Sequence, residues 1–234
     1  MTNAHIPRLV LPVVHHLDVD TTMSQAKIAF QAGAAGVFLI SHNGRDAQIA
    51  HCARLLKEQY PERKIGLNLL GAPASIALTI ASNIGIDMVW ADAPGVTSAG
   101  WTPAGLVLSE RLKLAGLPTF FGSVAFKYQP HDPCPARAAQ TCAQGGMLPT
   151  TSGEGTGKAP QLEKAQLMSE ALAGGPLAVA SGMTPENIAQ YLPYFTHYLV
   201  ATGVSRDMHH FDEARLAAFV QAVQAYAPPT TSPN

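Results

Sequence analysis

The segment Leu177–Asn187, LAVASGMTPEN, combines three signals that decide the fold. Its first four residues are apolar and suit a strand that is buried on both faces. Ser181 and Gly182 then favour a tight turn, because glycine adopts backbone conformations that other residues rarely reach. Thr184 and Pro185 are typical of a helix N-cap and of the first helical position. The segment therefore predicts a strand, a turn and a helix in succession.

Seven further apolar runs extend this arrangement over the whole chain. The eight runs begin between residues 9 and 198, at an average spacing of about 27 residues. They comprise residues 9–14, 36–40, 64–69, 88–91, 119–124, 147–150, 177–180 and 198–201. Helix-length segments separate them, and two of these carry apolar stripes at helical spacing. The stripes consist of Ile49, Cys52, Ala53 and Leu56, and of Leu216, Phe219, Val220 and Val223, with Asp212 as the expected cap of the last helix.

Eight strand signals that alternate with eight helix signals favour one architecture. In a chain of 234 residues they fit a closed (β/α)8 barrel, the TIM barrel of the α/β class, better than an open doubly wound sheet. No linker or shift in composition divides the chain. We therefore predict a single barrel domain over residues 1–227. Residues 228–234, which are uncharged and rich in Pro, Ser and Thr, are expected to form a disordered tail.

The composition excludes several classes of partner. The chain is 47% hydrophobic and 13% charged, with a formal net charge of -1, so no strong field attracts nucleic acid or an anionic membrane. Its three cysteines lack zinc-site spacing, and no apolar run approaches the roughly 18 to 20 residues that span a bilayer. The N-terminus does not resemble a signal peptide. We expect a cytoplasmic protein without membrane insertion, and the low charge leaves room for a homo-oligomer.

Barrel enzymes carry their active sites at the carboxyl ends of the strands, which reduces the candidate residues to a short list. Asp92 follows the fourth strand and Lys127 follows the fifth. A carboxylate and an amine in a partly dry mouth are natural acid/base candidates, and Lys127 could instead form a Schiff base with a carbonyl substrate. The structural alternative is an ion pair that only shapes the mouth, or a Lys127 side chain that reaches solvent.

Two further strand ends supply polar candidates. His15 could act as a base or anchor a substrate hydroxyl, and Asn68 could orient a substrate group. His16 should point away from His15 because side chains alternate along a strand. Potential metal ligands gather at the first two strand ends, as His15, His16, Asp18, His42 and Asp46, and in the last loop, as His209 and His210. Because no pair has metal-ligand spacing, we predict neither a metal nor a cofactor.

The last three loops predict an anion site. Glycines let backbone amides approach an anion closely, and barrels often bind phosphate after strands seven and eight. The candidate phosphate-binding residues of these two loops are Ser181, Gly182, Thr202, Gly203 and Ser205. The preceding loop could close over the anion, with Gly155, Thr156, Gly157 and Lys158 in contact with it. The alternative is that Gly182 and Gly203 only allow tight turns between strands and helices.

An ordered set of motifs resembles the BtpA/SgcQ family between about Arg8 and Tyr226. The stretch from Ile65 to Val89 is similar to that family's "GVNVLRN…AIA…GADFIRVN" segment. Further on, Thr156-Gly157-Lys158, Ala180–Asn187 and Val200–Gly203 resemble "TGxxTG", "GSGVTPEN" and "IVGT" in the same order. The resemblance implies a TIM barrel similar to the phosphate-binding barrels of the tryptophan-pathway and thiamin-phosphate-synthase type. Family members are linked to photosystem I accumulation and to sugar-metabolism gene clusters, without a settled reaction.

Several positions depart from the family pattern. An acid-Asn pair is usual where this chain has Ser41-His42-Asn43, an Asn is usual where it has Asp92, and a Lys-His pair is usual where it has Lys127-Tyr128. A second glycine-threonine element is replaced by Ser152–Gly155. These changes alter the hydrogen-bonding groups offered to a substrate, so we expect a divergent member with its own specificity.

The leading functional hypothesis is an enzyme, an isomerase, epimerase or aldol-type lyase, that acts on a small phosphorylated metabolite such as a sugar phosphate. A second hypothesis is a barrel that serves as a non-catalytic assembly or regulatory factor, as in photosystem biogenesis. A third is a metal-assisted hydrolase centred on His15 and Asp18. The charged pair Asp92 and Lys127 favours the enzyme, because a scaffold has no need of charged groups inside a barrel mouth.

Overall fold

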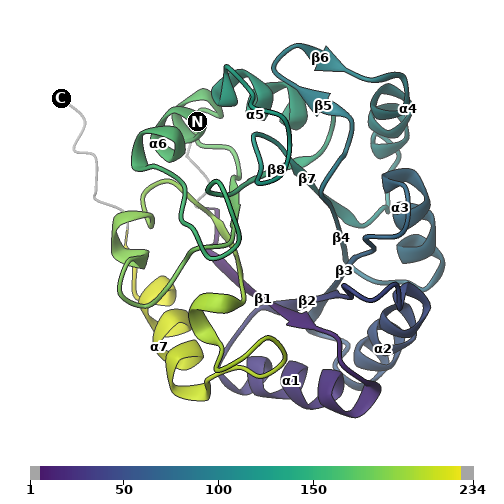
Figure 1. Cartoon of the computed structure of the whole chain (residues 1–234). Coiled ribbons are helices and arrows are strands. Elements are labelled where there is room, and N and C mark those ends of the chain that lie inside the picture. Colours follow the sequence, from purple (N-terminus) through teal and green to yellow (C-terminus); the bar gives the residue numbers. More distant parts are fainter. Residues whose placement is uncertain (1–5, 228–234) are drawn as a thin grey trace.

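The computed structural model describes residues 6–227, which form one closed barrel of eight parallel strands in the order β1-β10-β9-β8-β7-β4-β3-β2. The fold predicted from the sequence is thereby confirmed (Figure 1). The barrel strands are β1 Leu9–His15, β2 Gly36–Ile40, β3 Lys64–Asn68, β4 Met88–Ala91, β7 Thr119–Ser123, β8 Leu148–Thr151, β9 Ala178–Ala180 and β10 His197–Val200. Each of the eight overlaps one of the predicted apolar runs, with ends that differ by at most one residue. The predicted tail, residues 228–234, lies outside the described residues.

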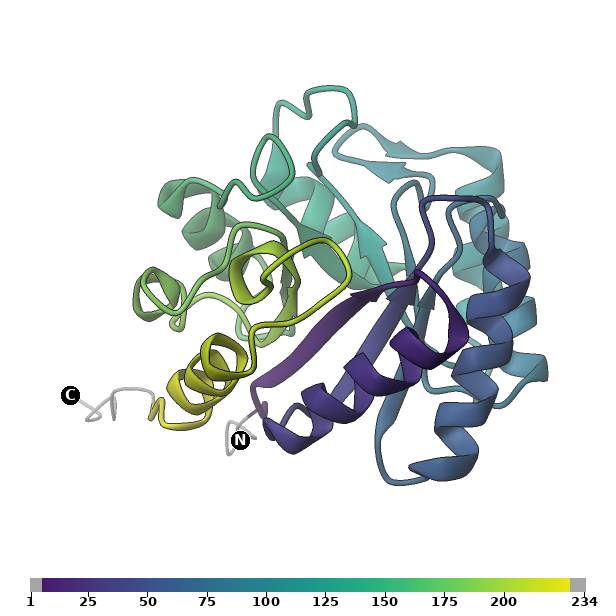
Figure 2. The same cartoon turned by 60° about the horizontal axis from the view of Figure 1, so that its bottom comes forward.

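Within the described residues, seven α-helices surround the barrel (Figures 1 and 2). They are α1 Val19–Gln31, α2 Asp46–Gln59, α3 Ala74–Asn83, α4 Pro103–Leu112, α5 Pro135–Gln144, α6 Leu162–Ala171 and α7 Glu213–Gln224. The buried positions of α2 and α7 are those of the two predicted apolar stripes, and the Asp212 side chain accepts a hydrogen bond from the Arg215 amide as the predicted cap. None of the helices between residues 6 and 227 combines the length and the apolar character that a bilayer crossing needs.

The prediction of eight helices was wrong at one place. The Thr184 hydroxyl does accept hydrogen bonds from the amides of Glu186 and Asn187, as an N-cap should, but only the short 3-10 helix η1 Ile188–Gln190 follows. Pro193 has no amide hydrogen, so a longer helix cannot continue through it. The chain must also return to β10 within a few residues, and it does so in turns.

Two layers of apolar side chains hold the barrel together. The larger layer lies between strands and helices, and the smaller one fills the barrel interior with residues such as Phe38, Trp90 and Phe121. The Phe38 ring meets the other two edge to face, with centroid distances of 6.0 Å to Trp90 and 5.1 Å to Phe121. The interior is therefore packed, and only the strand ends and loops are left to form a site. Two small elements not expected from the sequence, the hairpin β5 Val96–Thr97 with β6 Gly100–Trp101 and the 3-10 helix η2 Thr202–Val204, lie among these loops.

Candidate active site

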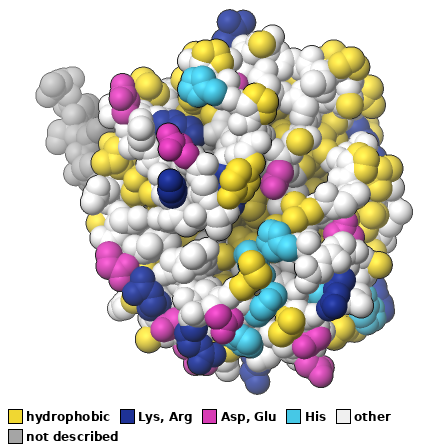
Figure 3. All heavy atoms as spheres, in the orientation of Figure 1, with side chains coloured by type: hydrophobic (Ala, Val, Ile, Leu, Met, Phe, Trp, Pro, Cys, Tyr) yellow, Lys and Arg dark blue, Asp and Glu magenta, His cyan; other side chains and the backbone are white. Residues whose placement is uncertain are grey.

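Four side chains predicted from strand ends come together at the carboxyl end of the barrel. His15 ends β1, Asn68 ends β3, Asp92 follows β4, and Lys127 follows β7. The Asn68 Nδ2 atom donates a hydrogen bond of 3.1 Å to Asp92 Oδ1. Seen from the side of Figure 1, histidine side chains gather beside a central hollow with an apolar floor (Figure 3). The mouth thus combines a carboxyl, an amide, an amine and imidazoles.

Burial moves the acid and the amine of this mouth toward neutral pH. Desolvation raises the pKa of Asp92 above its ordinary value, opposed by the Asn68 hydrogen bond and by the charges of Lys127 and His42. Desolvation lowers the pKa of Lys127, opposed by the negative charges of Asp92 and Tyr128. None of the ion pairs within the described chain joins Asp92 to Lys127. The two groups influence each other without the close ion pair of the structural alternative.

Three imidazoles occupy the side of the mouth formed by the first two strands. Burial lowers the pKa of His15 to about 4, and the positive charges of His42, His209 and Lys127 add to this effect, so His15 is neutral at pH 7. The His15 and His42 rings lie 5.0 Å apart. The buried Nδ1 atom of His15 has no hydrogen-bond partner within residues 6–227, a rare situation for a buried polar atom.

His209, which the sequence suggested only as a possible metal ligand, is the third imidazole beside His15 and His42. Its Nδ1 atom lies 3.0 Å from the carbonyl oxygen of His15. A carbonyl only accepts hydrogen bonds, so the His209 Nδ1 atom is the donor in this contact. His16 points to the other side of the strand, where its ring contacts the Thr22 hydroxyl and the Gln48 side chain at 2.8 and 2.9 Å.

The other residues considered for a metal serve local structure. Asp18 caps α1 by accepting a hydrogen bond from the Thr21 amide, and Asp46 accepts one from the Gly71 amide. Within the part of the chain that the structure describes, no three His, Cys, Asp or Glu side chains converge as metal ligands. This arrangement gives no support to metal-assisted hydrolysis at His15 and Asp18.

Lys127 lies in a strained turn that follows β7. Ala125 and Tyr128 both have positive φ, at 46° and 65°, although neither is glycine. Such conformations cost on the order of 1–3 kcal/mol each and persist only where the surrounding structure enforces them. The Lys127 amide donates a hydrogen bond of 2.8 Å to the Ser152 hydroxyl. Strain of this kind is concentrated at functional sites, which supports a role for the turn that carries Lys127.

The loop after β8 reaches both the mouth and the last two strand ends. The Gly157 amide donates a hydrogen bond of 2.8 Å to the Ser181 hydroxyl, and Gly157 faces the Thr202 side chain. The hydroxyl groups of Thr156 and Tyr128 lie 3.1 Å apart, and Lys127 Nζ lies 3.5 Å from the same threonine oxygen. The loop therefore brings the predicted anion-binding residues beside the predicted catalytic amine.

Backbone packing accounts for the two glycines of the predicted phosphate turns. A Cβ atom on Gly182, which has a φ of 75°, would lie 2.1 Å from the Ala159 nitrogen, and one on Gly203 would lie 2.0 Å from the Met183 carbonyl oxygen. Ser181 also has positive φ, at 96°. Glycine is thus required at both positions whether or not an anion binds. The exposed groups nearby are Thr156, Gly157, Lys158 and Thr202, whereas the Ser205 hydroxyl donates to the Ala201 carbonyl.

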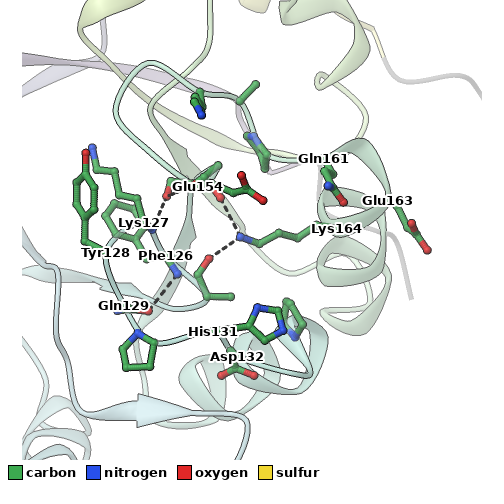
Figure 4. A pocket seen from close by; sticks show the side chains of 18 of the residues that line it. Phe126, Lys127, Tyr128, Gln129, His131, Asp132, Glu154, Gln161, Glu163 and Lys164 are labelled. Atoms are coloured by element: carbon green, nitrogen blue, oxygen red, sulfur yellow. Dashed lines mark hydrogen bonds between the residues drawn. The ribbon is translucent and has the colours of Figure 1, made fainter.

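A cavity of about 600 Å³ lies beside the mouth and was not foreseen from the sequence. It is lined by residues 125–132, residues 152–154, residues 158–161 and α6 (Figure 4). The Lys164 side chain extends from α6 and forms part of the cavity wall. Burial lowers the pKa of its amine to about 8, and the negative charges of Asp132 and Glu154 oppose this shift. Lys127, one of the mouth residues, also lines this cavity, together with Tyr128.

Comparison with known proteins places the chain among barrels of the same fold. A solved structure of phosphoribosyl anthranilate isomerase from Thermotoga maritima has a TM-score of 0.63 at 15% identity and covers 93% of this chain and 100% of its own. The isomerase from Thermus thermophilus has a TM-score of 0.63 at 16% identity, with 92% and 98% covered. A 2-keto-3-deoxy-6-phospho-gluconate aldolase from Zymomonas mobilis has a TM-score of 0.64 at 14% identity, with 95% of both chains covered.

No protein-family model matches this chain, and no curated protein matches it either. The solved structures are similar in fold alone at these identities. They confirm the barrel that the BtpA/SgcQ resemblance implies, whereas membership of that family stays a prediction.

Proposed function

We propose that this protein is an enzyme that moves a proton next to the carbonyl group of a small phosphorylated metabolite. Such a step underlies isomerisation, epimerisation and aldol-type cleavage of sugar phosphates. The observation that carries the proposal is the pair Asp92 and Lys127, whose pKa values burial moves from opposite sides toward neutrality in one barrel mouth. The solved barrels of similar fold include an isomerase and an aldolase of phosphorylated compounds, which is consistent with it.

In this proposal Asp92 and Lys127 have different chemical roles. The Asp92 carboxylate removes the proton from the carbon next to the carbonyl, and Asn68 holds one of its oxygens so that the other faces the substrate. Lys127 either donates a hydrogen bond to the carbonyl oxygen or forms an imine with release of water. The lowered pKa of Lys127 favours the imine, because the unprotonated amine is the form that attacks a carbonyl. In this proposal the neutral His15 ring binds a substrate hydroxyl.

The phosphate is assigned to the exposed cluster of Thr156, Gly157, Lys158 and Thr202, with Ser181 and the turns at Gly182, Gly203 and Ser205 behind it. Lys158 supplies positive charge, and hydroxyl and amide groups supply donors. Thr156 also contacts Tyr128 and Lys127, so an anion there lies beside the reacting amine. Binding energy at the phosphate then positions the other end of the substrate.

Hydrogen exchange tests the proposal without knowledge of the product. The protein is incubated in D2O with ribulose 5-phosphate, fructose 6-phosphate and 2-keto-3-deoxy-6-phosphogluconate, and loss of the proton next to the carbonyl is followed by NMR. We expect exchange in at least one compound, and a loss of about 100-fold or more in Asp92→Asn and in Lys127→Met. Borohydride added during turnover traps Lys127 covalently if an imine forms, and does not if it only donates a hydrogen bond.

The matched control is Lys113→Met, which removes an exposed amine paired with Glu110 on the outer surface. It should leave exchange unchanged. Absence of exchange in all three compounds, together with full function of the Asp92→Asn and Lys127→Met variants in cells, would overturn the enzyme proposal. That outcome would instead favour the non-catalytic assembly factor.

A further inference from the structure

The strained turn Ala125–Tyr128 is held by side chains from outside it. Its two left-handed residues need external contacts, because nothing in the turn's own sequence favours positive φ at alanine or tyrosine. The amide of Lys127 is already bound by the Ser152 hydroxyl, at 2.8 Å. Two further side chains, Gln129 and Lys164, contact the turn from opposite directions.

Gln129 uses its whole amide group to join the turn to two strand ends. Its Oε1 atom accepts a hydrogen bond of 3.0 Å from the Phe126 amide. Its Nε2 atom donates one bond of 2.6 Å to the carbonyl of Asp92 and another of 3.0 Å to the carbonyl of Ser123. One side chain therefore connects the backbone of Asp92, after β4, to the backbone next to Lys127, after β7. No other residue type offers two amide hydrogens and an acceptor at this length.

Lys164 holds the same turn from the side of the cavity. Its ammonium donates hydrogen bonds to the carbonyls of Ala125 and Ser152, and the Thr151 hydroxyl donates a second bond of 3.1 Å to the Ala125 carbonyl. Figure 4 shows Lys164 reaching the turn from α6, while the Lys127 side chain points away from Lys164. The ammonium thus binds carbonyls on both loops that meet beside Lys127.

On the basis of the function proposed above for Lys127 and Asp92, we propose that Gln129 and Lys164 are positioning residues that fix the Lys127 amine relative to the Asp92 carboxyl. Gln129 links the backbone that follows β4 to the backbone that follows β7. Lys164 keeps the loop after β8 against the strained turn. Without them the turn relaxes toward ordinary φ values, and the Lys127 amine leaves its partly dry position.

The test reads the reactivity of Lys127 directly. Pyridoxal 5′-phosphate, a phosphorylated aldehyde, forms imines with unprotonated lysine amines; borohydride reduction and peptide mapping then give the labelling rate at Lys127 as a function of pH. In Gln129→Met we expect the rate near pH 7.5 to fall about tenfold and the midpoint of its pH profile to rise, because a relaxed amine regains its ordinary pKa. Gln140→Met, which removes a surface glutamine bonded to the Ala171 carbonyl, is the matched control.

Lys164 is tested with two variants. Lys164→Met should reduce the labelling of Lys127 to a similar extent, and Lys164→Arg should restore most of it, because arginine still donates to both carbonyls. The proposal would be overturned if Lys127 were labelled at the same rate, and with the same pH midpoint, in Gln129→Met and Lys164→Met as in the control Gln140→Met. If one variant does not fold, as judged by its melting curve, the other decides. The readout needs no turnover, so failure of the proposed reaction and failure of positioning give different results.

Discussion

Replacement of Asp92 by asparagine is expected to make the protein more stable at neutral pH. Burial raises the pKa of this carboxyl, so the folded state binds its proton more tightly than the unfolded chain does. The cost of burying the charge is absent below the ordinary pKa of 3.8, grows as the pH rises through the folded-state pKa, and is fully present above it. Asparagine avoids this cost and can still accept the hydrogen bond from Asn68.

The size of the effect follows from the balance of two contributions. Each pH unit by which the pKa is raised corresponds to about 1.4 kcal/mol at neutral pH. This shift is already the balance between the cost of burying the charge and the attraction of the carboxylate to Lys127 and His42. We therefore expect a net gain in stability at pH 7.5, and each 1 kcal/mol of this gain raises the melting temperature of a domain of this size by about 2–4 °C.

Urea denaturation of the Asp92→Asn variant and of the unaltered protein at pH 7.5 and near pH 4 measures this difference. The gain should be present at pH 7.5 and shrink near pH 4, while proton exchange with substrate falls by about 100-fold or more. A variant that is less stable at both pH values by the same amount would refute the reasoning. It would mean that the carboxylate stabilises the fold and is not a buried charge kept for chemistry.

Three further predictions concern single positions. Gly182→Ala should lower the free energy of unfolding by about 3 kcal/mol in urea denaturation, because the new Cβ atom would collide with the Ala159 backbone. Gly174→Ala should lower it by about 1 kcal/mol, because Gly174 also has positive φ but has open space around it. Equal losses in the two variants would contradict this difference in packing. The His15 ring should titrate in NMR with a midpoint of about 4. Because the unfolded chain binds this proton more tightly, the protein should lose stability as the pH falls from 6.5 to 4. A midpoint near 6.5 would show that the ring is in contact with solvent. Asp212→Ala should lose about 1 kcal/mol through the missing cap of α7, and an unchanged melting curve would show that the cap does not contribute.

The strands were predictable because their residues are buried on both faces. Such strands consist of apolar residues and need no alternation, so runs like residues 36–40 stand out from the sequence directly. The stripes of α2 and α7 were predictable for a similar reason, since one face of each helix packs on the barrel. The missing eighth helix shows what such patterns do not predict. The cap at Thr184 was predicted correctly, but a cap does not determine the length of the helix, which Pro193 limits here.

The candidate site was predictable only where a residue ends a strand. His15, Asn68, Asp92 and Lys127 could be selected because parallel strands of a barrel end at one face. Gln129, Lys164 and His209 lie beyond the strand ends, and their contacts join residues that are between 3 and 194 positions apart in the chain. The sequence signal for His209 was that a second histidine, His210, follows it in the last loop. Gln129 and Lys164 had no such signal.

The sequence by itself determined the barrel, because the number, length and spacing of its apolar runs allow few other ways to bury them. It also determined which residue types reach the mouth. The tertiary structure decided the properties of those residues. Desolvation and nearby charges set the pKa values of Asp92, Lys127 and His15, and both depend on distances that exist only after the loops fold over the strand ends. The same packing decided that Gly182 and Gly203 are required by backbone contacts, whichever ligand the site binds.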